Sequence, residues 1–336
     1  MRFASLCVLL VLIAAILPVS GQMSTPTTDQ ASHFFAPVTT ISKVVDEVDL
    51  AFTVTDKRGH FVGNLQPTDF SLLDNNQAPQ RLTLFQQRSE LPLHLAVLID
   101  ASASVKDRLK FEQNAARSFL RKILRPGTDQ AFVVEFNDTV RTIQEPTDRI
   151  AKASQAVKKV NAEGNTALYD AIIYASEKLR QMPEHQLTRR GIILISDGVD
   201  TVKHSTLEQA QQAAARAEVM VFSVSTNNSD FEANAEGDIA LKELSAASGG
   251  VLFKGHADGD LQIAFQKVAK ALRNQYIIAY SPASFLADGS YRTVELVPRK
   301  SGLRTNYRKG YYAIVRQHLR LPSPNVLTDL VRNALH

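Results

Sequence analysis

Between residues 91 and 272, short apolar runs alternate with amphipathic segments of ten or more residues. Runs such as LPLHLAVLID and RRGIILISDG have the length and composition of strands that are buried on both faces. The segment SVKDRLKFEQNAARSFLRKIL has instead the apolar spacing of a helix. Strands that alternate with helices of this length predict an α/β domain, in which helices cover both faces of a doubly wound, mainly parallel sheet.

A different pattern precedes and follows this domain. The segment VDLAFTVTD opens an N-terminal β module, residues 42–88, in which apolar and polar residues alternate. Residues 275–315 contain three further strand-like runs. Neither flank can bury both faces of a sheet alone. Because the two ends of such α/β domains commonly lie near one another, we predict that the flanks pair into one β-sandwich-like domain, with the α/β domain inserted between them.

The predicted sandwich core draws on both flanks. Its predicted members are Val48, Leu50, Phe52, Val54, Phe70, Leu72 and Leu84, facing Ile277, Ala279, Val294, Leu296 and Tyr311. The tyrosines of the C-terminal flank are interpreted as strand formers that pack across strands. The alternative is an amphipathic face that binds a partner.

The N-terminal sequence MRFASLCVLLVLIAAILPVSGQ predicts a secretory signal peptide over residues 1–21. Its apolar run is shorter than the ~20 residues that span a bilayer, although a retained anchor is the alternative. After cleavage no second long apolar run remains, so the expected location is secreted, periplasmic or at the cell envelope. Residues 22–41 form a predicted linker and residues 316–336 a tail that can be helical. The only cysteine, Cys7, lies in the signal peptide, so the mature chain has no disulfides.

Charge and motifs exclude several classes of function. The net charge is +4, with Lys and Arg dispersed among Asp and Glu, which argues against a nucleic-acid partner. The eight histidines show no zinc-hydrolase spacing, and neither a nucleophile elbow nor a phosphate-binding loop is present. Catalysis is therefore not expected.

Oxygen-bearing side chains follow two buried strands. Asp100 ends one strand and Ser102 and Ser104 come directly after it, whereas Asp197 ends another strand. Thr166 lies between them, on a loop that opens a helix. In doubly wound sheets the carboxyl ends of the strands form the ligand-binding edge. A set of carboxylates and hydroxyls suits a hard divalent cation, with water in the remaining positions.

Other interpretations of these residues remain open. Ser104 can be a helix N-cap, with Asp107 completing a capping-box-like pair. Tyr169 and Asp170 are expected on a helix face or behind the ligands. Asp138 and Asp200 are expected to be solvated loop acids. Phosphorylation of Asp100 is conceivable, but it leaves the paired hydroxyls without a role.

Residues 91–272 resemble a von Willebrand factor type A domain, whose metal-ion-dependent adhesion site combines an Asp-x-Ser-x-Ser motif, a distant Thr and a distant Asp. The resemblance implies that Asp100, Ser102, Ser104 and Thr166 contact a metal directly or through water. It also implies that Asp197 acts through water, and that an acidic group of a partner completes the shell. Ala103 and Asn165 stand where the family often has glycine, and neither change removes a ligand oxygen. Residues 45–315 also resemble a secreted bacterial group described as VWFA-related proteins.

The sequence and the resemblance together predict a secreted or envelope adhesion protein. It would hold a divalent cation, Mg²⁺ first and Mn²⁺ or Ca²⁺ as alternatives, and capture Asp or Glu of a protein partner. The alternatives are a metal-dependent hydrolase or phosphoacceptor, and a scaffold whose metal is structural.

Overall fold

The computed structural model describes residues 47–183, 187–227, 232–255 and 258–314. The predicted signal peptide, linker and C-terminal tail lie outside these ranges. Within them, every helix is too short or too polar to cross a membrane.

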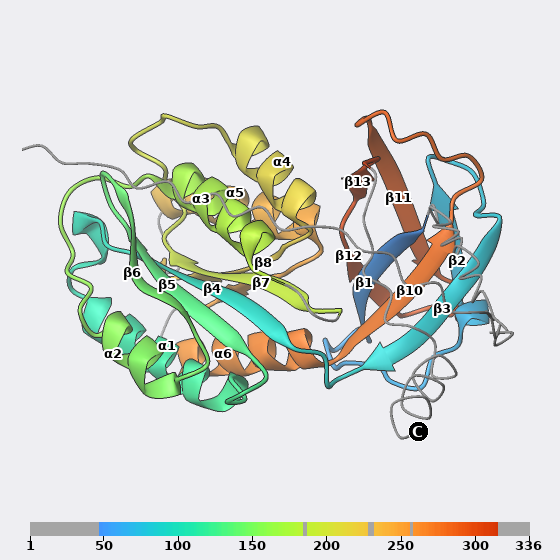
Figure 1. Cartoon of the computed structure of the whole chain (residues 1–336). Coiled ribbons are helices and arrows are strands. Elements are labelled where there is room, and N and C mark those ends of the chain that lie inside the picture. The colour runs from blue at the N-terminus through green and yellow to red at the C-terminus, as the bar shows by residue number, and fades with distance from the viewer. Residues whose placement is uncertain (1–46, 184–186, 228–231, 256–257, 315–336) are drawn as a thin grey trace, which may run out of the picture. The chain divides into compact units, whose positions relative to one another are not determined.

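The central domain is built on one six-stranded sheet, with the strand order β6-β5-β4-β7-β8-β9 (Figure 1). All neighbours are parallel except the edge strand β6, which is antiparallel to β5. The strands are β4 (Leu93–Asp100), β5 (Gln130–Phe136), β6 (Val140–Thr147), β7 (Arg189–Ser196), β8 (Met220–Ser225) and β9 (Leu252–Lys254). The predicted doubly wound, mainly parallel sheet is confirmed.

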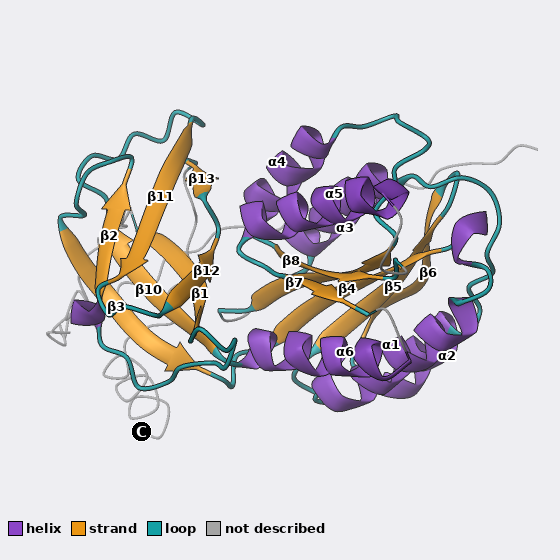
Figure 2. Ribbon diagram, turned by 180° about the vertical axis from the view of Figure 1, so that it is seen from behind, coloured by secondary structure: helices purple, strands orange, loops and turns teal. Residues whose placement is uncertain are grey.

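Helices cover both faces of this sheet (Figure 2). One layer contains α1 (Leu109–Ile123), α2 (Ile150–Val157) and α6 (Asp258–Arg273), and the other contains α3 (Leu168–Gln181), α4 (Leu207–Ala217) and α5 (Glu232–Ser248). Alternate residues of β4 enter the two cores: Leu95 and Val97 pack toward α1, whereas Ala96 and Leu98 pack toward α3. This explains why β4 is apolar without alternation, since both of its faces are buried.

Two further sheets form the β-sandwich. Their strand orders are β12-β1-β10-β3 and β13-β11-β2. The strands are β1 (Val48–Thr55), β2 (Phe70–Asp74), β3 (Arg81–Arg88), β10 (Gln275–Ser281), β11 (Tyr291–Pro298), β12 (Arg304–Tyr307) and β13 (Gly310–Tyr312). Strand β1 lies between β10 and β12, β3 pairs with β10, and β2 pairs with β11. Strands from the two ends of the described chain thus lie side by side, blue beside orange in Figure 1, and the predicted pairing of the flanks is confirmed.

The predicted sandwich core is correct for most positions and wrong for three. Ile277, Ala279 and Leu84 do not belong to this core. Their neighbours Tyr276, Ile278, Tyr280 and Phe85 occupy it instead. A shift of one residue exchanges the two faces of a strand.

Hydrogen bonds explain why tyrosines face this core. The Tyr280 hydroxyl donates to Oδ2 of the buried Asp74 at 2.7 Å, and the Tyr276 hydroxyl donates to the carbonyl of Val62 at 3.1 Å. A buried phenol is tolerated where its hydroxyl is paired. The interpretation of the tyrosines as packing residues is confirmed for Tyr276, Tyr280, Tyr307 and Tyr311, which are buried.

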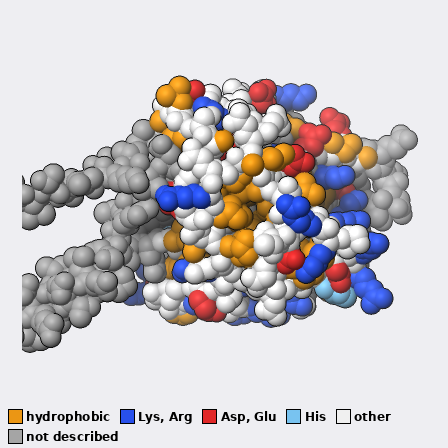
Figure 3. Space-filling model, turned by 90° about the vertical axis from the view of Figure 1, so that its right-hand side faces the viewer, with side chains coloured by type: hydrophobic (Ala, Val, Ile, Leu, Met, Phe, Trp, Pro, Cys, Tyr) orange, Lys and Arg blue, Asp and Glu red, His pale blue; other side chains and the backbone are white. Residues whose placement is uncertain are grey.

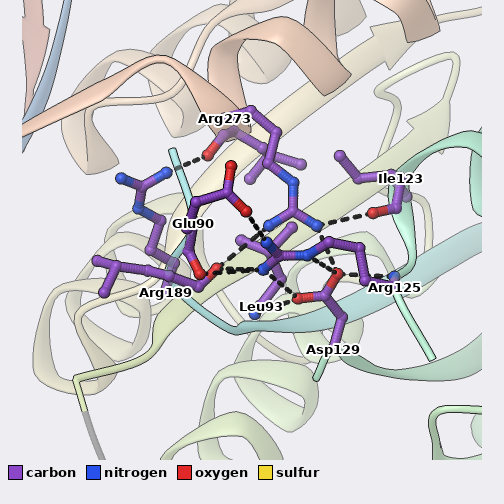
Figure 4. A network of polar contacts seen from close by, with 9 residues as sticks. Glu90, Leu93, Ile123, Arg125, Asp129, Arg189 and Arg273 are labelled. Atoms are coloured by element: carbon purple, nitrogen blue, oxygen red, sulfur yellow. Dashed lines mark hydrogen bonds and ion pairs between the residues drawn. The ribbon is translucent and has the colours of Figure 1, made fainter. Parts of the chain in front are cut away.

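An arginine network lies where the chain passes between the sandwich and the α/β domain (Figure 4). Arg125 and Arg273 both pair with the fully buried Asp129, whose Oδ1 also accepts from the Leu93 amide at 3.0 Å. Burial alone would raise the pKa of Asp129, but the hydrogen bonds from Arg125 and Arg273 outweigh it and hold that pKa below its ordinary value. Glu90 pairs with Arg125 from the connecting segment. The network fixes the amino ends of the strands, opposite the predicted site.

The sandwich also exposes apolar surface. Leu82, Leu286 and Val297 are exposed, and Figure 3 shows hydrophobic side chains at the centre of one face of the molecule, with Lys and Arg around them.

Candidate functional site

Asp100 is the last residue of β4 and is fully buried. Its Oδ1 accepts a hydrogen bond from the Ser102 amide at 2.9 Å, and its Oδ2 accepts one from the Ser196 hydroxyl at 2.6 Å. Burial, and next the charge of Asp197, raise the pKa of Asp100 to about 6, although these hydrogen bonds oppose the shift. The carboxyl group is therefore held in a fixed position, in a setting where added positive charge would favour ionisation.

The two serines of the motif connect Asp100 to the second carboxylate. The hydroxyls of Ser102 and Ser104 lie 3.0 Å apart, and the Ser104 hydroxyl donates to Oδ2 of Asp197 at 2.7 Å. A short 3₁₀ turn, Ala103–Val105, follows Ser102. Helix α1 begins only at Leu109, so the alternative in which Ser104 caps this helix is wrong. The Ser104 hydroxyl instead donates to Asp197, the first residue after β7.

Thr166 lies on a loop that is tied to both strand ends. The carbonyl of Gly164, two residues earlier, accepts from the Ala103 amide at 3.0 Å. The Thr166 amide donates to the Thr201 hydroxyl at 2.8 Å, and the Thr201 amide donates to the Thr166 carbonyl at 2.9 Å. Thr166 is buried, with 4% of its surface exposed. The loop is thus fixed between the Asp-x-Ser-x-Ser segment and the segment after Asp197.

Glycine is required in this loop at Gly164. Its φ of +78° favours glycine, and a Cβ there would lie 1.9 Å from a carboxylate oxygen of Asp138. Asp138 also accepts a hydrogen bond from the Asn165 side chain at 2.6 Å. Asp138 was expected to be a solvated loop acid; it is exposed, but it also fixes the loop that carries Thr166.

The acids after Thr166 and Asp197 serve local structure. Asp200 accepts from the backbone amide of Lys203 at 2.9 Å, and Asp170 accepts from the Ser205 hydroxyl. Neither contacts Asp100 in the structure described. The placement of Asp170 behind the ligands stays a prediction.

The donor set fits a hard divalent cation. It contains two carboxylates and three hydroxyls at one edge of the sheet, and Asp100, Ser102 and Thr166 are each at most 4% exposed. No group of three or more His, Cys, Asp or Glu side chains within the described residues could hold a metal. A metal at this edge would therefore need the hydroxyls as ligands, and oxygen donors of this kind suit Mg²⁺ or Ca²⁺ better than zinc.

The match to a known family covers this strand edge. Residues 95–199, from β4 to just beyond Asp197, match the family described as the von Willebrand factor type A domain. The central α/β domain is a von Willebrand factor type A domain. Membership of the secreted bacterial group stays a prediction.

The chain also aligns with two curated relatives over stretches that are longer than this domain. The chain is 25% identical over 266 residues to inter-alpha-trypsin inhibitor heavy chain H4 of Bos taurus. The aligned part is 74% of this chain and 27% of the relative. It is 26% identical over 264 residues to the same protein of Sus scrofa, with 74% and 26% covered. The chain thus spans about a quarter of the length of these relatives.

The chain is also similar to solved structures. The von Willebrand factor type A protein from Catenulispora acidiphila is 13% identical, with 83% of this chain and 77% of that chain covered and a TM-score of 0.46. The vWF domain of the type V pili tip protein Mfa5 from Porphyromonas gingivalis is also 13% identical, with 54% and 94% covered and a TM-score of 0.45.

Two polar side chains behind the proposed site were not predicted from the sequence, Ser196 and Asn227. Ser196 donates to Asp100 and accepts from the Gly198 amide at 3.0 Å, and the Asn227 side chain donates to the Asp197 carbonyl at 2.8 Å. The signal for Ser196 was available, because a polar residue ends the apolar run IILIS. Asn227 follows β8 and gives no such signal, because it reaches Asp197 only through the pairing of β7 with β8.

Proposed function

We propose that the chain is an adhesion or binding protein whose von Willebrand factor type A domain holds one divalent cation, Mg²⁺ first. Asp100, Ser102, Ser104, Thr166 and Asp197 would hold it. The bound cation would supply a positive centre for a carboxylate of a protein partner. The observation that carries the proposal is the chain of hydrogen bonds that joins the ends of two strands. The Ser102 amide donates to Asp100, the hydroxyls of Ser102 and Ser104 lie 3.0 Å apart, and the Ser104 hydroxyl donates to Asp197.

The geometry gives less support to catalysis. One cluster contains the residue types of a catalytic triad, namely Ser205, His204 and Asp170. Both Ser205 and His204 contact Asp170, with His204 Nδ1 at 3.5 Å, so Asp170 lies between them and no Ser–His bond activates the serine. Asp100 is fully buried with both oxygens bonded, which argues against phosphorylation.

A secreted or cell-envelope location belongs to the same proposal. It is supported by the sequence of residues 1–21, which has the features of a signal peptide. Fractionation of cells that express the full chain, followed by N-terminal sequencing, tests location and cleavage together.

The partner is tested by capture in the presence and absence of the cation. Immobilised protein is incubated with envelope extract in Mg²⁺ and then eluted with EDTA. Wild type is expected to release a specific protein on chelation, and Thr166→Ala is expected to capture at least tenfold less because it loses a ligand hydroxyl. The matched control is Thr128→Ala, an exposed threonine just before β5 at the opposite edge of the sheet. Full capture in EDTA would contradict the adhesion-site proposal and would point to the exposed apolar face of the sandwich.

A further inference from the structure

Glu112 is a buried acid for which neither the fold nor the proposed ligand set gives a role. It lies in the first turn of α1, with 1% of its surface exposed. Neither of its carboxylate oxygens has a hydrogen-bond partner in the part of the chain that the structure describes. The Thr226 hydroxyl, just after β8, is near enough to lower the pKa of Glu112 slightly, but the two groups do not meet the geometry of a hydrogen bond. Buried polar groups are nearly always paired, because an unpaired one costs stability.

Three carboxylates act on one another in this region. Burial raises the pKa of Glu112 to about 8; Arg108 opposes the shift, and the charges of Asp100 and Asp197 add to it. Arg108 is the cation that acts on Glu112 among the described residues, and it is only half-buried. The buried region around Glu112 thus has more negative than positive charge, and water screens this excess least at the buried carboxylates.

Glu112 is not placed to bind the metal directly. It forms no group with Asp100 and Asp197 that could hold a metal. It is close enough for its charge to interact with both of them. This is the position of a residue that acts behind the ligands, where charge and hydrogen bonding adjust how tightly a metal is held.

We propose that Glu112 is an additional carboxylate of the metal site, which strengthens cation binding through its negative charge and not as a direct ligand. The inference rests on the proposed function, since it requires a cation at Asp100, Ser102 and Ser104. A cation there would offset the repulsion from Asp100 and Asp197 and would favour the ionised form of Glu112. Cation binding near neutral pH should therefore displace a proton from this side chain.

The test is calorimetric titration of the full chain with MgCl₂. Titration at about pH 7 in two buffers with different ionisation enthalpies counts the protons released. With a pKa of about 8, Glu112 is about nine-tenths protonated at pH 7, so wild type is expected to release close to one proton per cation. Glu112→Gln, which keeps the shape and removes the charge, is expected to bind Mg²⁺ about tenfold more weakly and to release few protons.

Two controls separate charge from structure. Glu163→Gln removes an exposed carboxylate beside Gly164, where water screens its charge, and should change the affinity less than twofold. Without metal at about pH 9, Glu112→Gln should be at least as stable as wild type, because it removes a buried unpaired charge. A merely structural role would instead make the variant less stable and leave proton release unchanged.

The outcomes distinguish this inference from the proposed function. If wild type binds no Mg²⁺, Mn²⁺ or Ca²⁺, the metal site fails and Glu112 has no role in it. If wild type binds but Glu112→Gln matches it in affinity and proton release, the site stands and the role of Glu112 is wrong. If Glu112→Gln does not fold, the number of protons that wild type releases decides. A release well below half a proton per cation at pH 7 would overturn the inference.

Discussion

The hydroxyl of Ser104 donates a hydrogen bond to Oδ2 of Asp197, 2.7 Å away and 93 positions later in the chain. This bond joins the loop after β4 to the loop after β7. Together with the hydrogen bonds of Ser102, it links the two carboxylates of the proposed site through two hydroxyls and one backbone amide. Burial and the charge of Asp197 raise the pKa of Asp100, and a divalent cation would reduce the repulsion between the two carboxylates.

Metal binding is expected to stabilise the folded protein. A ligand that binds only the native state adds about 2.7 kcal/mol to the free energy of unfolding at a hundredfold excess over its dissociation constant. Mg²⁺ should therefore raise the melting temperature of wild type, and Asp100→Ala should abolish that rise. Differential scanning fluorimetry with MgCl₂ and with EDTA measures both. An identical melting temperature in the two solutions for wild type would contradict the site.

The pH dependence should differ with and without metal. The folded pKa of Asp100, about 6, lies above its ordinary value of 3.8. Between these values the folded state holds a proton that the unfolded state has lost, so ionisation of Asp100 destabilises the fold as pH rises through about 6. Asp100→Asn should remove that component in EDTA. In Mg²⁺ the opposite trend is expected, with stabilisation by the cation increasing through the same range. Urea unfolding at about pH 5 and pH 7 tests both trends.

Ser196 is expected to position Asp100 for the cation. Its hydroxyl donates to Oδ2 of Asp100 at 2.6 Å and accepts from Gly198. Ser196→Ala should weaken Mg²⁺ binding about tenfold or more, as substitutions behind a metal ligand commonly do. The matched control is Ser225→Ala, at the end of β8, whose hydroxyl donates to Asp238 at 2.6 Å. Equal effects of the two substitutions on metal affinity would count against a specific role for Ser196.

The architecture of the α/β domain could be predicted because burial on both faces leaves a clear pattern. Strands β4 and β7 are almost continuous apolar runs, and their order follows from general rules for βαβ units. The faces of β10 could not be predicted as readily. In the segment YIIAYS, both faces hold apolar side chains, and the face with the tyrosines can enter the core because Asp74 accepts the Tyr280 hydroxyl. That partner lies on β2, far away in sequence.

The residues of the proposed site also divide into those that the sequence indicates and those that it does not. Asp100, Ser102, Ser104, Thr166 and Asp197 could be selected because each lies at or just after a predicted strand end or on a glycine-led loop. Glu112 could not be selected, because on a helix surface a glutamate is ordinary. Only the packing of α1 against the sheet shows that this glutamate is buried and unpaired.

The tyrosine pair on Asp74 should contribute measurably to stability. The hydroxyls of Tyr280 and Tyr311 both donate to Oδ2 of Asp74, at 2.7 and 2.9 Å. Hydrogen bonds to a charged group are typically worth about 1.5–3 kcal/mol. Tyr280→Phe should lower the free energy of unfolding by about that amount, whereas Tyr291→Phe, at a half-exposed position, should have little effect. A double-mutant cycle with Tyr311→Phe measures the coupling between the two bonds, and additive losses would contradict a shared acceptor.

Deletion of residues 275–336 should unfold the N-terminal strands as well. Strand β1 pairs only with β10 and β12, β3 pairs only with β10, and β2 pairs only with β11, as far as the described strands show. Each N-terminal strand would therefore lose all of its neighbours, and a strand without a sheet is not stable in water. Hydrogen exchange measures this directly, because residues 48–88 should lose protection while the amides of β4, β5 and β7 keep theirs. The retained protection of the central sheet is the internal control, since a general collapse would remove it too. Protection that persists in β1 and β3 of the truncated chain would show that the N-terminal module folds without its C-terminal partners, and the sandwich would then be an association of two independent units.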